Sequence, residues 1–155
     1  MATKSVNITP TLLLLEKLST INQDQQGNTP IPSKAMMMFI GAMNGLRRNA
    51  EGIEKKLDDT LVEAEKGKDK EEIAVVLLGL GYFHYTKTNY PKSLEYYNKS
   101  LSLWKQIHGD TNIRLADLLK DIAVLYDAVS NTTESKKVIA QYEQLFKING
   151  KEIPK

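Results

Sequence analysis

Apolar residues recur every three or four positions along most of this chain, which is the spacing of one face of an α-helix. After Ser33 the pattern predicts six helices, the first through Met36, Ile40 and Met43. The other five are expected at about 52–66, 70–87, 91–108, 112–130 and 133–148. No run alternates apolar and polar residues over the length of a strand. The pattern therefore predicts an all-α protein.

Several predicted helices begin or end at a residue suited to that place. Ser33 is expected to cap the first helix, and Asp69 the helix at 70–87, where Glu72 completes a capping-box pattern. Pro91 stands at the start of the next helix and Gly109 just after its end. The helix at 70–87 is apolar on most of its circumference, so it is expected to pack on more than one side.

Residues 1–32 differ from the rest. A short helix is predicted from Pro10 to about Asn22, followed by a polar linker up to Pro32. This helix either caps the first helix pair or lies in a groove of the array as an internal ligand, the cap being the simpler interpretation. The chain is thus divided into an N-terminal helix with linker at 1–32, a helical domain at 33–148 and a tail at 149–155.

Composition removes several classes of function. The 155 residues carry 21 Lys and Arg against 19 Asp and Glu, a formal charge of +2, which is too balanced for a nucleic-acid-binding surface. The absence of cysteine excludes disulfides, thiolate metal sites and cysteine nucleophiles. We find no signal peptide or membrane-spanning stretch, so a cytoplasmic protein is expected, with no membrane partner.

One segment carries the strongest sequence pattern. Leu80-Gly81, the aromatic Tyr90, and the small residues Ser93 and Ser100 with Tyr97 between them resemble the tetratricopeptide repeat. Small residues in such places let two antiparallel helices approach closely, while the aromatic side chains fill the space beside them. The resemblance implies a short α-solenoid of antiparallel helix pairs, with six or seven helices in all.

The pattern recurs 42 residues later, where Ala123 and Ser135 take the places of Gly81 and Ser93. A weaker copy lies upstream, with Ile40-Gly41 placed 40 residues before Leu80-Gly81, and Leu57 and Leu61 under Tyr97 and Leu101. A period near 42 resembles the repeats of kinesin light chains. The match covers about residues 33–148, and three units meet the usual minimum for a stacked array.

The resemblance implies a function as well as a fold. Tetratricopeptide arrays bind peptides on the concave surface lined by the first helix of each pair, so we expect a non-enzymatic protein–protein interaction module, an adaptor, chaperone or regulatory partner. Its partner is another protein or peptide segment. A carboxylate clamp is not favoured, because Tyr82 stands where the family's clamp asparagine is expected. The predicted groove residues are Val75, Leu78, Tyr82, Tyr85, Asp117, Lys120, Val124 and Asp127.

Other interpretations remain open. The helix at 133–148 carries Val138, Ile139 and Phe146 without an obviously polar outer face, so self-association as a homodimer through it is the second hypothesis. A helical enzyme or nucleic-acid binder is the third. His84 is expected to be a packed core residue, with one ring nitrogen hydrogen-bonded, and His108 to end a helix. We predict no catalytic residues, no cofactor and no metal site.

Overall fold

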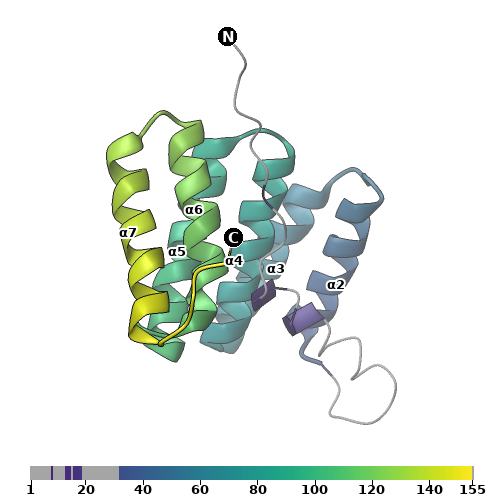
Figure 1. Ribbon diagram of the computed structural model, residues 1–155. Helices are drawn as coiled ribbons and strands as arrows, with labels where there is room; N and C mark the ends of the chain where they lie inside the picture. Colours follow the sequence, from purple (N-terminus) through teal and green to yellow (C-terminus); the bar gives the residue numbers. More distant parts are fainter. Residues whose placement is uncertain (1–7, 9–12, 15, 19–31, 155) are drawn as a thin grey trace.

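The computed structural model describes residues 8, 13, 14, 16–18 and 32–154, and all regular structure in this part of the chain is helical. Figure 1 shows the helices standing side by side in alternating directions, as in a helical-repeat solenoid. The predicted fold class is confirmed. The helices are α2 (Lys34–Arg47), α3 (Ile53–Gly67), α4 (Lys70–Thr86), α5 (Tyr90–His108), the short 3-10 helix η2 (Ile113–Leu115), α6 (Ala116–Ala128) and α7 (Thr132–Ile148).

Three hairpins make up the array: α2 with α3, α4 with α5, and α6 with α7, each stacked on the next through α3–α4 and α5–α6. Helix α4 lies at the centre. Every side chain from Ala74 to Gly81 is buried, as are Phe83 and His84. This confirms that the helix packs on more than one side, and it places the core of the domain around α4.

The predicted caps form, with one difference. The Ser33 hydroxyl accepts a hydrogen bond from the Met36 amide (3.1 Å), and Asp69 accepts from the amides of Glu71 (2.9 Å) and Glu72 (3.2 Å). Glu72 does not complete the expected capping box, because its carboxylate accepts a hydrogen bond from the Ser33 hydroxyl instead (2.8 Å). The side chain thereby joins the start of α4 to the start of α2.

The 42-residue period is visible in the hydrogen bonds. The Ser93 hydroxyl donates to the carbonyl of Gly81 (2.7 Å), and the Ser135 hydroxyl donates to the carbonyl of Ala123 (3.2 Å). The connecting turns match too, since Thr88 and Ser130 have φ angles of 59° and 62°. The second and third hairpins therefore repeat the same backbone geometry.

The upstream copy needs a correction. Gly41, predicted to match Gly81, is exposed, and a Cβ atom built on it meets nothing within 4 Å. Ala42 is the buried equivalent, 39 residues before Gly81. In the second helix the predicted offset of 40 holds, because Leu57 is buried as Tyr97 is. The span from Ala42 to Leu57 in the first hairpin is thus one residue shorter than the span from Gly81 to Tyr97 in the second. The sequence spacing did not reveal this difference.

Close approach of α4 to its neighbours depends on small residues. A Cβ atom on Gly79 would lie 2.5 Å from Cε1 of Phe39 in α2, and one on Gly81 would lie 3.2 Å from the ring of Tyr97 in α5. The Ser100 hydroxyl donates to the carbonyl of Ala74 (2.7 Å), so α5 and α4 are joined at both ends of their contact. The proposed role of small residues in helix packing is confirmed at these positions.

Candidate partner-binding groove

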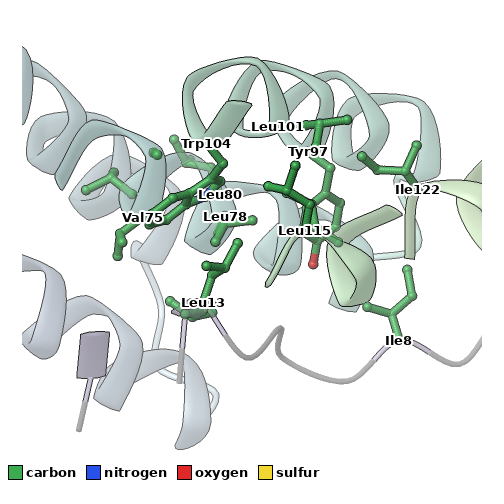
Figure 2. Close-up of a cluster of buried hydrophobic side chains, with 14 of the residues drawn as sticks. Ile8, Leu13, Val75, Leu78, Leu80, Tyr97, Leu101, Trp104, Leu115 and Ile122 are labelled. Atoms are coloured by element: carbon green, nitrogen blue, oxygen red, sulfur yellow. The ribbon is translucent and has the colours of Figure 1, made fainter. Parts of the chain in front are cut away.

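The described residues before α2 lie across the array. We name residues 8, 13, 14 and 16–18 the N-terminal segment; residues 13, 14 and 16–18 are helical. Ile8, Leu13 and Leu14 are only 5%, 3% and 1% exposed, and they belong to the same buried cluster as α4 and α6 residues. In Figure 2, Leu13 lies below Val75 and Leu78, and Ile8 lies at the other end of the cluster near Ile122.

Polar contacts fix the direction of the N-terminal segment. The Ile8 amide donates to the Tyr85 hydroxyl near the end of α4 (3.1 Å), and the Lys17 ammonium pairs with Glu71 near its beginning (3.0 Å). Glu16 pairs with Arg114 of η2. The segment therefore runs antiparallel to α4, on the side of α2, α4 and α6 that we name the inner face. The contacts of the described residues fit the internal-ligand alternative, whereas the rest of the predicted helix and the linker at 19–31 lie outside the described residues.

A hollow of about 240 Å³ remains beside the segment. Leu14 and Leu18 line it from the segment, Met43 and Leu46 from α2, and Tyr82 from α4. Most of its lining is apolar, with Arg47 and Asn49 at the edge. This groove between α2 and α4 is a part of the inner face with room for additional side chains.

The eight predicted groove residues fall into separate environments. Val75 and Leu78 are fully buried under the segment, while Tyr82 and Tyr85 are partly exposed, with ring centroids 5.7 Å apart. Lys120, Val124 and Asp127 line a different hollow, of about 200 Å³, together with Ile139 of α7 and Ile153 of the tail. Asp117 is exposed on α6 and lines neither hollow. The structure thus does not place the α4 and α6 residues in one pocket.

The C-terminal tail approaches the same face. In Figure 1 the yellow tail turns back from the end of α7 across α6 toward the middle of the array. The Asn149 amide donates to the carbonyls of Thr111 (2.9 Å) and Leu145 (2.7 Å), which fixes the start of this turn. Both ends of the described chain therefore border the inner face.

A buried acid lies between α4 and α6. Burial, and then the neighbouring Asp117, raise the pKa of Asp121 to about 8, against a smaller opposing effect of Lys120. Burial also raises the pKa of Tyr82, with contributions from Tyr85 and Asp121. At neutral pH the Asp121 carboxyl is therefore mainly protonated, and it adds a neutral polar group rather than a charge to the inner face.

The two histidines have structural surroundings. His84 is buried and stacks on Tyr96 at 5.5 Å between ring centroids, and Glu54 lies 3.8 Å from its Nε2 atom. That nitrogen has no hydrogen-bond partner among the described residues. Burial lowers the pKa of His84, while Glu54 acts in the opposite direction. His108 ends α5, as predicted, and stacks on Trp104.

The described residues also bear on metal binding and on membrane insertion. They contain no group of three or more His, Cys, Asp or Glu side chains arranged to hold a metal ion. None of the helices that they form is long and apolar enough to cross a membrane.

Most of the apolar side chains suggested for self-association through α7 are buried. Val138, Leu145 and Phe146 are buried, and Tyr142 is partly buried in edge-to-face contact with Phe146 at 5.0 Å. Of the apolar residues on which the dimer hypothesis rests, Ile139 is exposed, and Ile148 at the end of α7 is exposed as well. Homodimerisation through α7 stays a prediction, with less apolar surface available than the sequence indicates.

The sequence analysis gave docking of the N-terminal helix in a groove as one of two alternatives, but it named none of the helix's side chains among the predicted groove residues. The run Leu12–Leu15 followed by Glu16 and Lys17 was an available signal, since it combines an apolar face with a pair of opposite charges. The residues that pair with its two charges lie 54 and 98 positions away along the chain, and no local pattern identifies them. Fold and groove together define a helical-repeat array with a peptide-sized inner face.

Comparisons with known proteins agree with this class. Residues 72–147 match the family model described as tetratricopeptide repeat. Through this region the chain is similar to the tetratricopeptide-repeat family. It is also 31% identical over 98 residues to a protein of Rippkaea orientalis (strain PCC 8801 / RF-1) named photosystem I assembly protein Ycf3. The alignment covers 63% of this chain and spans about half, 52%, of that protein. No solved structure matches the chain significantly.

Proposed function

We propose that this chain is a non-enzymatic protein-binding module that acts in the assembly or regulation of a protein complex. One observation carries the proposal: the inner face already binds a segment of polypeptide, with Leu13 and Leu14 buried and a backbone amide held by Tyr85. A surface that buries leucines and hydrogen-bonds a main-chain amide has the chemistry needed to bind a helical or extended peptide.

The proposed binding residues are those predicted members that reach the surface. Tyr82 and Tyr85 supply broad apolar contact with a polar tip, while Asp117, Lys120 and Asp127 orient the partner through charge. Val75 and Leu78 form the buried floor beneath them, and Val124 lines the second hollow. Similarity to the tetratricopeptide-repeat family supports protein binding, and the similarity to a protein named for assembling a photosystem supports an assembly role.

Affinity capture from native lysate, read by mass spectrometry, tests the proposal. The full chain is compared with a variant of the exposed inner-face acids, Asp117→Lys with Asp127→Lys. A matched control changes two exposed acids of α3 and α5, Glu65→Lys with Glu95→Lys, by the same total charge.

We expect a partner that the wild-type chain and the control retain and the inner-face variant loses. A partner kept equally by all three forms would place binding elsewhere. Folded protein that captures no partner in any form would contradict a binding module. No observation favours the enzyme or nucleic-acid hypotheses.

A further inference from the structure

We propose that the N-terminal segment is a built-in competitor for the groove between α2 and α4. A partner occupies this groove by displacing the segment with a helix of the same chemistry: two adjacent leucines followed by an acidic and then a basic residue. This inference rests on the proposed function and names the class of partner that fits it.

The segment has the buried anchors of a ligand. Leu13 and Leu14 are adjacent in a helix, yet both are almost completely buried. The two side chains line different hollows: Leu13 lines one beside α4, and Leu14 lines the one that borders α2. The Ile8 amide bonds to a tyrosine hydroxyl rather than to a helix carbonyl. A main-chain donor of this kind is available in any peptide, so the contact does not restrict the partner's side chain at that position.

Two ion pairs set the register of the N-terminal segment on the inner face. Glu16 pairs with Arg114 of η2, and Lys17 pairs with Glu71 of α4. These ion pairs are partly exposed to solvent, and pairs of this kind contribute more to orientation and partner choice than to affinity. A partner with the two charges in reversed order would place like charges opposite each other at both positions.

The fit of the segment is incomplete, which makes it replaceable. The hollow of about 240 Å³ next to Leu14 and Leu18 is large enough to take additional apolar atoms between Met43 and Tyr82. A partner with a larger side chain at the position of Leu18 gains contacts that the internal segment lacks. Attachment to the same chain compensates the segment for this poorer fit, since a tethered ligand competes at an effective concentration of the order of millimolar.

The test uses the full chain and a fluorescent synthetic peptide with the sequence of residues 5–22, measured by fluorescence anisotropy. Wild-type protein is compared with Leu13→Asp plus Leu14→Asp, which makes docking of the tethered segment unfavourable and leaves every side chain of α2, α4 and η2 unchanged. We expect the variant to bind the peptide at least tenfold more tightly than the wild type. Equal affinity for both forms would overturn the proposal.

A milder release variant, Glu16→Arg, protects the test against misfolding, because Glu16 lies at the surface and its replacement faces Arg114. This variant is also expected to bind the peptide more tightly than the wild type.

A charge exchange checks the site itself. In the Leu13→Asp, Leu14→Asp chain, Arg114→Glu should weaken binding of the natural peptide and favour a peptide carrying Glu16→Arg. A peptide with Leu18→Phe should bind the released chain more tightly than the natural peptide. Failure of the exchange to reverse the preference would overturn the assigned register.

The two proposals fail in distinguishable ways. If the released chain binds no peptide but lysate capture still depends on Asp117 and Asp127, the internal-ligand inference fails and the binding module stands. If the peptide competes as expected and lysate capture finds no partner, the groove chemistry stands and the assembly role fails.

Discussion

The hairpins α4–α5 and α6–α7 have the same backbone geometry but differ in burial. Tyr97 and Ile139 lie 42 residues apart at equivalent places, yet Tyr97 is 1% exposed and Ile139 is 40% exposed. Helix α5 is packed between α4 and α6, whereas α7 packs on α6 at the end of the array. The repeat pattern therefore specifies a hairpin, and position in the array determines how much each side chain contributes to stability.

A second pair of equivalent positions differs in chemistry. Gly79 and Asp121 are also 42 residues apart, and both face the preceding hairpin. At Gly79 the missing side chain leaves room for Phe39, while at Asp121 a carboxyl is buried near Tyr82. Packing at Gly79 is thus apolar and tight, whereas packing at the equivalent Asp121 includes a titratable carboxyl group.

Removing the two equivalent side chains gives the largest expected contrast. Tyr97→Ala should lower the free energy of unfolding by about 4 kcal/mol, because it empties a fully buried site. Ile139→Ala should cost less than about 1 kcal/mol, since the side chain is partly in water. Urea unfolding followed by circular dichroism measures both values. Similar losses in the two variants would contradict an effect of position in the array.

Asp121→Asn should stabilise the fold in a pH-dependent way. The folded-state pKa of about 8 lies above the unfolded value of 3.8, so between these values the folded state binds more protons and wild-type stability falls as pH rises. Asparagine removes this loss. We expect almost no difference at pH 4 and a gain of about 4 kcal/mol at pH 7, at about 1.36 kcal/mol for each pKa unit. Exposed Asp127→Asn is the control, and a parallel gain there would refute burial as the cause.

Gly79→Ala should destabilise the protein although alanine favours helices. The new Cβ atom would meet the buried ring of Phe39 at 2.5 Å, so we expect a net loss of about 1.5 kcal/mol. Gly41→Ala, at an exposed helical site with open space around it, should instead stabilise by about 0.5 kcal/mol. Thermal unfolding of both variants shows whether the signs are opposite; stabilisation in both would mean that Phe39 moves aside.

The smallest expected effect concerns His84, whose equivalent in the next hairpin is Tyr126. The Tyr126 hydroxyl bonds to Asn98 (3.2 Å), and Asp58 lies 40 residues before Asn98 on the equivalent helix. His84→Tyr should place a hydroxyl near Asp58 and stabilise the fold by about 1 kcal/mol at pH 7.5. His84→Phe, which lacks the hydroxyl, is the control and should gain less.

The same substitution has a defined pH dependence. Burial lowers the folded-state pKa of His84, so wild-type stability is lost as pH falls below the unfolded value of about 6.5. The advantage of His84→Tyr should therefore be larger at pH 5.5 than at pH 7.5. Denaturant titrations at the two pH values measure it, and a smaller advantage at pH 5.5 would show that Glu54 outweighs desolvation.

Local rules were sufficient to predict the helices. Caps such as Ser33 and Asp69, together with apolar spacing, placed most helix ends within about two residues, because these features act over one or two turns. The main local difference is η2, where the first residues of the predicted helix at 112–130 form a 3-10 turn. The register of the first hairpin was wrong by one residue, since Gly41 resembles Gly81 in type but not in burial.

The groove was less predictable than the fold. Val75 and Leu78 have the right spacing for a binding surface, but whether a face of α4 is open depends on what covers it. Here the covering residues come from a segment more than 50 positions away. Lys120 and Val124 line a hollow that Ile153 of the tail completes, and the tail carries no apolar periodicity from which this could be predicted.

The position of Trp104 gives the protein an intrinsic optical reporter. This residue is the chain's single tryptophan, it is buried, and it lines a hollow together with Leu13, Glu16 and Arg114. Departure of the N-terminal segment would let water reach the indole ring, so its fluorescence emission would shift to longer wavelength. Release of the N-terminal segment can therefore be followed in unlabelled protein and in real time, and the rate of the spectral shift reports how long the segment stays bound.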